Sequence, residues 1–250
     1  MLRLGSSLKG YKIEATDGGI GSVDDLLFDD TTWKLRWMVV DTGGWLGGAK
    51  VLIHPSMIGV ADDVDETLSV RLSKKQVENS PGRLQDLPMS QQSESDLYDY
   101  YGWDPAWSGS YFGPGAVMSS RLSGNVKRRA EMASLQTDGG DPHLRSINAV
   151  IGYHVHATDG AIGHVEDMLI DDQNWLINYL IIDTRNWWVG QHVLISPFAV
   201  QEINYSDSVV RLDIPCDRIR SSPPWAPVDV IDAPYQLKLH GYYNWPGYGW

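Results

Sequence analysis

Hydrophobic and polar residues alternate in short stretches near the start of the chain, with the two-residue period of β-strands. Residues 8–15 (LKGYKIEA) show this alternation, and residues 33–42 (WKLRWMVVDT) show it most strongly. In the second stretch one face carries Trp33, Leu35, Trp37 and Val39, and the opposite face carries Lys34 and Arg36. Asp-Gly-Gly and Asp-Asp-Thr-Thr separate the stretches and are typical of tight turns, because glycine and aspartate tolerate positive φ.

Further strands follow from the same pattern. They are expected within Ile20–Phe28, with a bulge near Asp24-Asp25, at Lys50–His54, from Val60 onward and at Leu68–Leu72; Lys74–Glu78 is expected to form one helical turn. About six short strands with frequent turn signals predict a small closed or nearly closed β-barrel. No helical period of 10–15 residues lies between the strands, so a βαβ sheet is disfavoured.

The whole pattern occurs twice. Gly10–Pro55 is repeated as Gly152–Pro197, at a constant offset of 142. A repeat of this length indicates a duplicated domain, since solenoid periods are roughly 20–50 residues. Most residues kept in both copies are hydrophobic residues, turn glycines or turn aspartates, which are determinants of the fold. Copy two is expected to have a loop two residues shorter before Val209–Leu212, with a compensating gain around Pro215-Cys216.

Each copy is followed by an aromatic segment, which we call a hook. The first hook is Leu97–Trp103 (LYDYYGW) and the second is Leu239–Trp245 (LHGYYNW), again 142 residues apart. The pair Leu2-Arg3 also reappears as Leu144-Arg145. Residues 104–142 are rich in Gly, Ser and polar residues and predict a flexible linker, with a short helix near Asn125–Leu135.

These features divide the chain into two domains and their tails. We expect an all-β fold with a first barrel at 1–82, a hook and flexible linker at 83–145, a second barrel at 146–224 and a C-terminal hook at 225–250.

Charge and composition then limit the function. The net charge of −12 makes a nucleic-acid partner held by electrostatic attraction improbable. No apolar run approaches the roughly 20 residues that span a bilayer. The N-terminus has no signal-peptide core, and the single Cys216 excludes an intrachain disulfide framework. We therefore expect a soluble cytoplasmic protein.

A few residues could carry chemistry. His154-x-His156 places two imidazoles on one strand face and His164 could approach from the next strand, which would suit a metal. Copy one has Lys12, Glu14 and Ser22 at these positions, so a solvated strand face is the favoured interpretation.

The remaining candidates also have simpler explanations. Asp24, Asp25, Asp29 and Asp30 could bind a cation or act as paired acid and base, but their turn positions favour capping of backbone N–H groups. Cys216 has no counterpart in copy one, and the glycine-rich GGWLGG loop lacks the lysine and following helix of a phosphate site. We predict no catalytic, cofactor-binding or metal-binding residue, and no enzyme.

The aromatic composition is more informative. Eleven Trp and twelve Tyr against three Phe favour rings with a polar tip, as at interfaces. The candidate interaction surface comprises Trp45, Trp187, Trp188, Tyr100, Tyr101, Trp103, Tyr242, Tyr243, Trp245 and Trp250. Two interpretations remain open. Each hook covers its own barrel and completes a small core, or the hooks and loop tryptophans dock a partner or the other domain.

The repeated motif resembles a known family. The pattern G-Y-x-[IV]-x-A-x-D-G-x-I-G-x-V-x-D, followed by D-D-x-x-W-x-[LI]-x-[WY]-[ML]-[VI]-[VI]-D-T and V-L-I-x-P, is similar to the PRC-barrel domain. That domain forms the cytoplasmic part of the photosynthetic reaction centre H subunit and the C-terminal domain of the bacterial ribosome maturation factor. The resemblance covers Gly5–Pro81 and Ile147–Pro223 and is greatest to bacterial stand-alone proteins with two such domains in tandem.

The resemblance implies a fold and a habit of binding proteins, and the family has no shared catalytic residue. We therefore expect a non-enzymatic interaction or adaptor module with no cofactor. Its partner is expected to be a protein, with a second copy of the chain as one candidate. The alternative is a small-molecule or metal-binding protein that uses a cleft between the two barrels.

Overall fold

The computed structural model describes the first repeat, most of the second repeat and all of the second hook. The described residues are 1–81, 83–84, 97, 100–102, 141, 143–184, 192–226 and 231–247. The short helix expected near Asn125–Leu135 lies outside them.

The chain forms two compact units. Lys9–Leu144 makes up the first-repeat unit, whereas Met1–Leu8 joins the chain from Arg145 onward in the second-repeat unit. The first eight residues thus belong with the repeat that begins more than a hundred residues later. A division into consecutive stretches of sequence does not foresee this arrangement.

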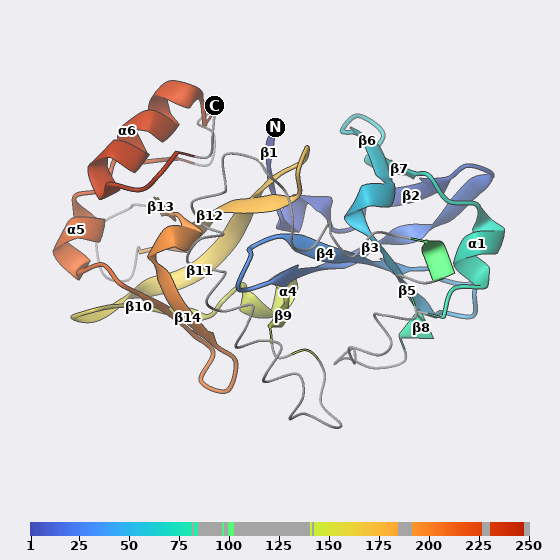
Figure 1. The fold of residues 1–250 in the computed structure, drawn as a ribbon, viewed down its shortest axis with the longest axis horizontal. Helices are drawn as coiled ribbons and strands as arrows, with labels where there is room; N and C mark the ends of the chain where they lie inside the picture. Colours follow the sequence, from blue (N-terminus) through green and yellow to red (C-terminus); the bar gives the residue numbers. More distant parts are fainter. Residues whose placement is uncertain are drawn as a thin grey trace. The chain divides into compact units, whose positions relative to one another are not determined.

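The first-repeat unit is built on one sheet (Figure 1). Its elements in chain order are β2 (Lys12–Ala15), β3 (Gly18–Asp29), β4 (Leu35–Asp41), β5 (Lys50–Ile53), η2 (Pro55–Met57), β6 (Ile58–Asp62), β7 (Thr67–Val70), α1 (Lys74–Glu78) and β8 (Arg83–Leu84). The strand order is β6-β7-β2-β3-β4-β5-β8, in which β2 and β7 are parallel. The helical turn predicted at Lys74–Glu78 is confirmed as α1, which Ser73 and Gln76 close with a capping box.

The second-repeat unit has the same plan. After β1 (Leu2–Leu4) and η1 (Ser6–Leu8), its elements are α4 (Ile147–Val150), β10 (His154–Ala157), β11 (Gly160–Asp171), β12 (Leu176–Asp183), β13 (His192–Ile195), η4 (Pro197–Ala199), β14 (Val200–Asn204), β15 (Val209–Leu212), α5 (Cys216–Arg220) and α6 (Ala233–Tyr243). The strand order is β13-β12-β11-β10-β15-β14, with β10 and β15 parallel.

The repeats stay in register for longer than the sequence suggested. Strand β15 follows β7 at the offset of 142, and α5 follows α1 at the same offset. The expected two-residue shift before Val209 is therefore wrong. Glu66 and Ser208, which end the two equivalent turns, both adopt positive φ, at 50° and 52°. The side chains in this turn differ between the repeats while the backbone conformation is the same. Alignment by residue identity alone therefore introduced a gap that the structure does not have.

The all-β prediction is confirmed, but in the described residues neither sheet closes into a barrel. β6 and β14 end their sheets and pair on one side with β7 and β15. The bulge predicted near Asp24-Asp25 is present as a register shift between Val23 and Asp25, and the second repeat repeats it. Such a shift increases the local twist and bends the long strand.

The prediction for residues 33–42 is wrong in two respects. Trp33 precedes β4 and has a φ of 58°, which a bulky residue adopts only under strong local constraint. The face expected to be polar is also buried: Arg36 is nearly inaccessible, as are Met38 and Val40. Packing on both faces of β4, which includes the first hook on one of them, overrides the alternation.

Each repeat is completed by the strand that precedes the other repeat. β1 pairs antiparallel with β11, so that Leu2 lies opposite Asp171 and Leu4 opposite Leu169. β9 (Leu144–Ser146), which precedes the second repeat, pairs with β3. The two repeats therefore exchange their N-terminal strands.

Candidate interaction surface

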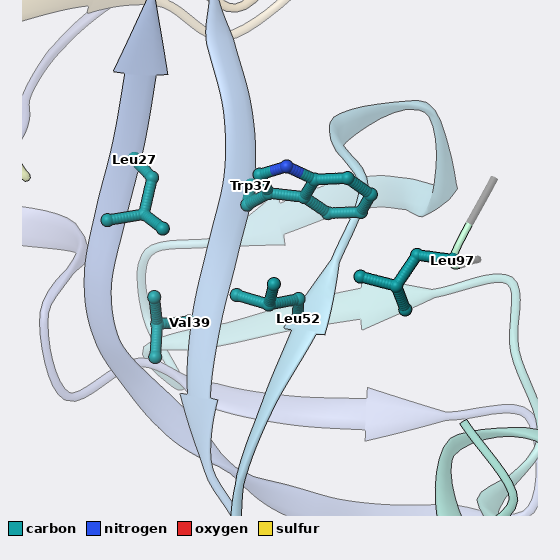
Figure 2. Close-up of a cluster of buried hydrophobic side chains, with 5 residues drawn as sticks. All are labelled: Leu27, Trp37, Val39, Leu52 and Leu97. Atoms are coloured by element: carbon teal, nitrogen blue, oxygen red, sulfur yellow. The ribbon is translucent and has the colours of Figure 1, made fainter. Parts of the chain in front are cut away.

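The first hook places Leu97 in the core of the first-repeat unit. Leu97 is fully buried, and Figure 2 shows it facing the side chains of β4 and β5. Its neighbours in this cluster are Leu27, Trp37, Val39 and Leu52, with Met57, Tyr101 and Leu144 packed at the edge. Burial of a leucine of this kind stabilises the fold by about 1.5–3 kcal/mol. The hook thus supplies core that the small sheet lacks.

The second hook begins inside helix α6, in red in Figure 1. Asp232 caps the helix by accepting a hydrogen bond of 2.9 Å from the Tyr235 amide. Leu239, His240 and Tyr243 form its buried face. The Trp245 ring then stacks on Tyr243, with 4.1 Å between ring centroids.

Both hooks dock through equivalent contacts. The Tyr100 hydroxyl donates to the carbonyl of Gln76 at 3.2 Å, and the Tyr242 hydroxyl donates to the carbonyl of Arg218 at 2.7 Å. These pairs are related by the offset of 142. The next ring along each hook, Tyr101 or Tyr243, stands perpendicular to its neighbour at 4.9 or 4.8 Å. The hooks therefore bind their own repeats, as the first of the two interpretations expects.

Burial of the inner tyrosines changes their titration. Removal from water raises the pKa of Tyr101, against a smaller opposing effect of its side-chain hydrogen bond with Ser80, and raises the pKa of Tyr243 to about 12. Both phenols stay neutral over the physiological pH range. They pack against their own repeats, Tyr101 at the edge of the Leu97 cluster and Tyr243 on the buried face of α6.

In each unit a histidine ring packs against a fully buried aromatic side chain. His54 meets Trp37 edge to face at 5.5 Å, and His240 meets Tyr179 edge to face at 5.8 Å. His54 also accepts the Ser56 amide and thereby caps η2, a task that Ser196 performs for η4. Burial, with a smaller contribution from Arg36, lowers the pKa of His54 to about 4.

His240 bonds at both ring nitrogens. Its Nδ1 lies 2.6 Å from the carbonyl oxygen of Pro246, which can only accept, so Nδ1 carries the proton. Nε2 then accepts the Tyr179 hydroxyl at 2.8 Å. Burial lowers the pKa of His240, which favours this neutral form. The sequence showed both histidines, but nothing in it indicated that each would pack against a buried aromatic ring.

The outer aromatic candidates are distributed unevenly. Tyr100 and Trp45 remain partly exposed, and the Lys74 ammonium lies 5.0 Å from the centre of a Trp45 ring. That distance is within the range of a cation–π contact. Four further candidates lie outside the described residues: Trp103, Trp187, Trp188 and Trp250.

Several strongly exposed apolar side chains were not among the candidates from the sequence. Val60 on β6 is 80% exposed, and Val64 at the β6–β7 turn is 92% exposed. In the second repeat, Tyr205 at the β14–β15 turn is 68% exposed. The available signal was the presence of apolar residues in turns that polar residues normally occupy. We call the β6–β7 and β14–β15 hairpins, with their exposed tips, the two hairpin surfaces, one in each unit.

The histidines of the second repeat lie on strands beside carboxylates. His154 lies opposite His164, and His164 Nε2 is 3.7 Å from Asp183 Oδ2. His192 Nε2 contacts Glu166 Oε2 at 2.7 Å, where the first repeat has the ion pair of Lys50 and Asp24. In the described ranges no group of three His, Cys, Asp or Glu side chains is arranged to hold a metal.

The turn aspartates have two different tasks. Asp29 accepts the amides of Thr31 and Thr32, which is the capping expected. Asp30 instead contacts the His143 ring at 2.8 Å, so it holds the segment before β9. That long-range task was not predicted.

Cys216 is a poor nucleophile. Burial, followed by the neighbouring Asp159, raises the pKa of its thiol to about 11. Its amide donates to Asp159 at 2.7 Å at the start of α5. The thiol therefore stays protonated at neutral pH, and the thiolate is the reactive form.

Comparison with known proteins identifies the repeat. A family model described as the PRC-barrel domain matches residues 2–77 and 142–219, which together exceed half of the chain. No curated protein matches the sequence. The matched stretches include the exchanged strands β1 and β9 as well as the two sheets. Among the described residues no helix has the length and apolar character needed to cross a membrane. The chain belongs to the PRC-barrel domain family, of which it carries two copies in tandem.

Proposed function

We propose that this protein is a non-enzymatic interaction module that binds protein partners through its two hairpin surfaces, one in each unit. The observation that carries the proposal is the exposure of Val60, Val64 and Tyr205 at equivalent hairpins of the two repeats. Val60 and Val64 lie on one hairpin, and exposed apolar side chains grouped in this way are typical of interaction sites. Tyr101 and Tyr243 of the hooks are packed against their own repeats and are therefore poorly placed to contact a partner.

The strands beside these side chains also favour a binding role. Among the described residues, β6 and β14 each end a sheet and pair with a strand on one side, so the other side of each presents backbone N–H and C=O groups. An open strand edge is a template for pairing with an extended segment of another protein. The apolar side chains would then add contact area next to the backbone pairing.

The charge of the first hairpin suggests the chemistry of the partner. Val64 lies between Asp62, Asp63, Asp65 and Glu66 in the sequence. Asp62 accepts the amides of Val64 and Asp65, which fixes the valine at the tip. A partner surface with a small apolar depression and basic residues around it would complement this tip.

The experiment is affinity capture with cross-linking from cells of the source organism, followed by binding measurements with the purified partner. Wild type is compared with Val60→Ser/Val64→Ser and with Tyr205→Ser. Leu237→Ser is the matched control, because Leu237 is a similarly exposed apolar residue, at 57%, on α6. We expect the control to bind as wild type does, and at least one hairpin variant to bind about tenfold more weakly.

The proposal fails if both hairpin variants bind the captured partner as tightly as wild type. It also fails if Leu237→Ser weakens binding as much as they do, since that result would place the contact on α6. Circular dichroism of each variant verifies that the fold is intact.

A further inference from the structure

The exchanged strand lies in a site built to receive it. The carbonyl oxygen of Met1 accepts the Asp172 amide at 3.0 Å, and the carbonyl of Met168 accepts the Gly5 amide at 2.8 Å. Between these bonds, β1 pairs with the end of β11 in antiparallel register. We call Met1–Leu8 the flank, and the end of β11 with Asp167 and Asp172 the acceptor edge.

Side chains add charge and shape to this backbone pairing. Arg3 Nε donates to Asp172 Oδ2 at 2.8 Å, with both side chains largely removed from water. Asp167 is 5% exposed and accepts both the amide and the hydroxyl of Ser6. Gly5 passes so close to Ile147 that an added Cβ would lie 3.2 Å from its side chain. The acceptor edge therefore recognises a particular sequence as well as an extended backbone.

The first repeat binds a flanking segment in the same way. The carbonyl of His143 accepts the Asp30 amide at 3.0 Å, which matches the bond between Met1 and Asp172 at the offset of 142. The Asp30 carboxylate also contacts the His143 ring. Each acceptor thus binds the segment that precedes the other repeat. A few residues join the flank to its own repeat, yet the flank pairs with the other one.

We propose that the acceptor edge also binds the flank of a second copy of this chain, so that two molecules exchange flanks in trans. An acceptor that recognises a segment outside its own repeat makes the same contacts whichever chain supplies that segment. Exchange of an identical element between chains is a low-cost route to a dimer. In the native chain the flank and the acceptor edge are covalently connected, which favours the cis contact and therefore the monomer.

The acceptor edge is independent of the hairpin surfaces, because it lies on different strands. Dimers should form when the cis flank is lost or displaced from the acceptor edge. Its test therefore uses two complementary full-length variants. The acceptor variant carries Leu2→Asp, Arg3→Asp and Leu4→Asp, which disable its flank. The donor variant carries Asp167→Arg and Asp172→Arg, which disable its acceptor edge.

We expect each variant alone to sediment as a monomer and an equimolar mixture to form a one-to-one dimer. A chain carrying all five substitutions is the matched control and should not pair with the donor variant. In a second measurement, a labelled peptide of residues 1–8 is titrated into the acceptor variant. It should bind, and the same peptide with Arg3→Asp should bind about tenfold more weakly.

The proposal is overturned if the mixture stays monomeric at about 100 μM, a concentration accessible to a specific dimer, or if the peptide does not bind. If the acceptor variant loses structure in its second repeat, excess peptide should restore the thermal transition, because ligand binding stabilises the folded form. Failure of the peptide to restore that transition equally overturns the proposal.

Discussion

At the scale of single residues, Gly21 and Gly163 show why the motif keeps a glycine after its isoleucine. Their φ angles are 145° and 155°, and a Cβ at either position would lie 2.0 Å from the carbonyl oxygen of Asp41 or Asp183. No side chain fits there, so β3 can approach β4, and β11 can approach β12, only through glycine.

This close approach leads to the first prediction. Gly21→Ala should destabilise the first-repeat unit by more than about 3 kcal/mol, because backbone strain and a steric clash add. Gly44→Ala is the control, since nothing lies within 4 Å of its added Cβ, and it should change stability by less than about 0.5 kcal/mol. Urea unfolding of both variants measures the difference; equal midpoints would contradict the close packing.

The second prediction concerns pH and His54. Its folded-state pKa of about 4 lies below its ordinary value of 6.5, so the unfolded chain binds more protons between these values. Stability should therefore rise with pH from about 4 to 6.5, by up to about 3 kcal/mol from this residue. Above that window the histidine is neutral in both states and adds no further pH dependence.

Carboxylates titrate over part of the same range, so the measurement needs a reference. His54→Ser supplies it, because Ser196 performs the same capping in the second repeat. Urea unfolding at several pH values should show a shallower rise for the variant than for wild type. Parallel curves would mean that His54 is not the titrating group.

At the scale of elements, the hooks illustrate how a tail becomes part of a core. The rings that made the hooks look like partner-binding segments mostly contact their own repeat. Tyr101 and Tyr243 are turned inward, and Leu97 and Leu239 are fully buried. Because Leu97 and Leu239 occupy equivalent places, the residues between sheet and hook could diverge as long as they span the distance.

Two leucines on one helix test this packing. Leu239→Ala should cost about 2–5 kcal/mol, the usual range for a buried leucine, whereas Leu237→Ala should cost less than about 0.5 kcal/mol. Trp245→Ala, which removes the ring stacked on Tyr243, should also lower the melting temperature of the second-repeat unit. If Leu239→Ala and Trp245→Ala both leave that temperature unchanged, the second hook does not dock.

At the scale of the whole molecule, residues distant in sequence complete each unit. Arg36 Nη1 donates to Asp141 at 2.6 Å and lies 3.5 Å from Asp29, and all three side chains are buried. The ion pair with Asp141 joins β4 to the end of the linker, across 105 residues. In the second repeat Asn178 replaces Arg36, so this contact is particular to the first-repeat unit.

The fourth prediction follows from this burial. Arg36→Ala should destabilise the first-repeat unit by about 3–5 kcal/mol, because two buried carboxylates lose their guanidinium. Lys50→Ala is the control in the same unit, since its pair with Asp24 is largely exposed and should contribute less than about 1 kcal/mol. Thermal unfolding compares them; similar losses would show that burial does not strengthen the Arg36 contacts.

The sequence by itself determined the duplication, the all-β class, the bulge near Asp24-Asp25 and the helical turn at Lys74–Glu78. These features depend on local period, turn residues and capping, which act between neighbours in the chain. The repeat also predicted which positions would form the core, because equivalent hydrophobic residues must fill equivalent spaces.

Only the tertiary structure decided which chain segment completes each repeat and which polar residues are buried. Arg36 looked solvent-facing because alternation reports one covered face, and β4 is covered on both. Leu2-Arg3 and Leu144-Arg145 were visible as a repeated pair, but their exchange was not, since pairing between strands has no local signature. The exposed Val64 and Tyr205 likewise became candidates once the structure placed their hairpins at the ends of the described sheets. Long-range packing decides these outcomes, because segments distant in the sequence can pair with the same strand edge or cover the same sheet face. The local hydrophobic pattern does not indicate which segment will do so.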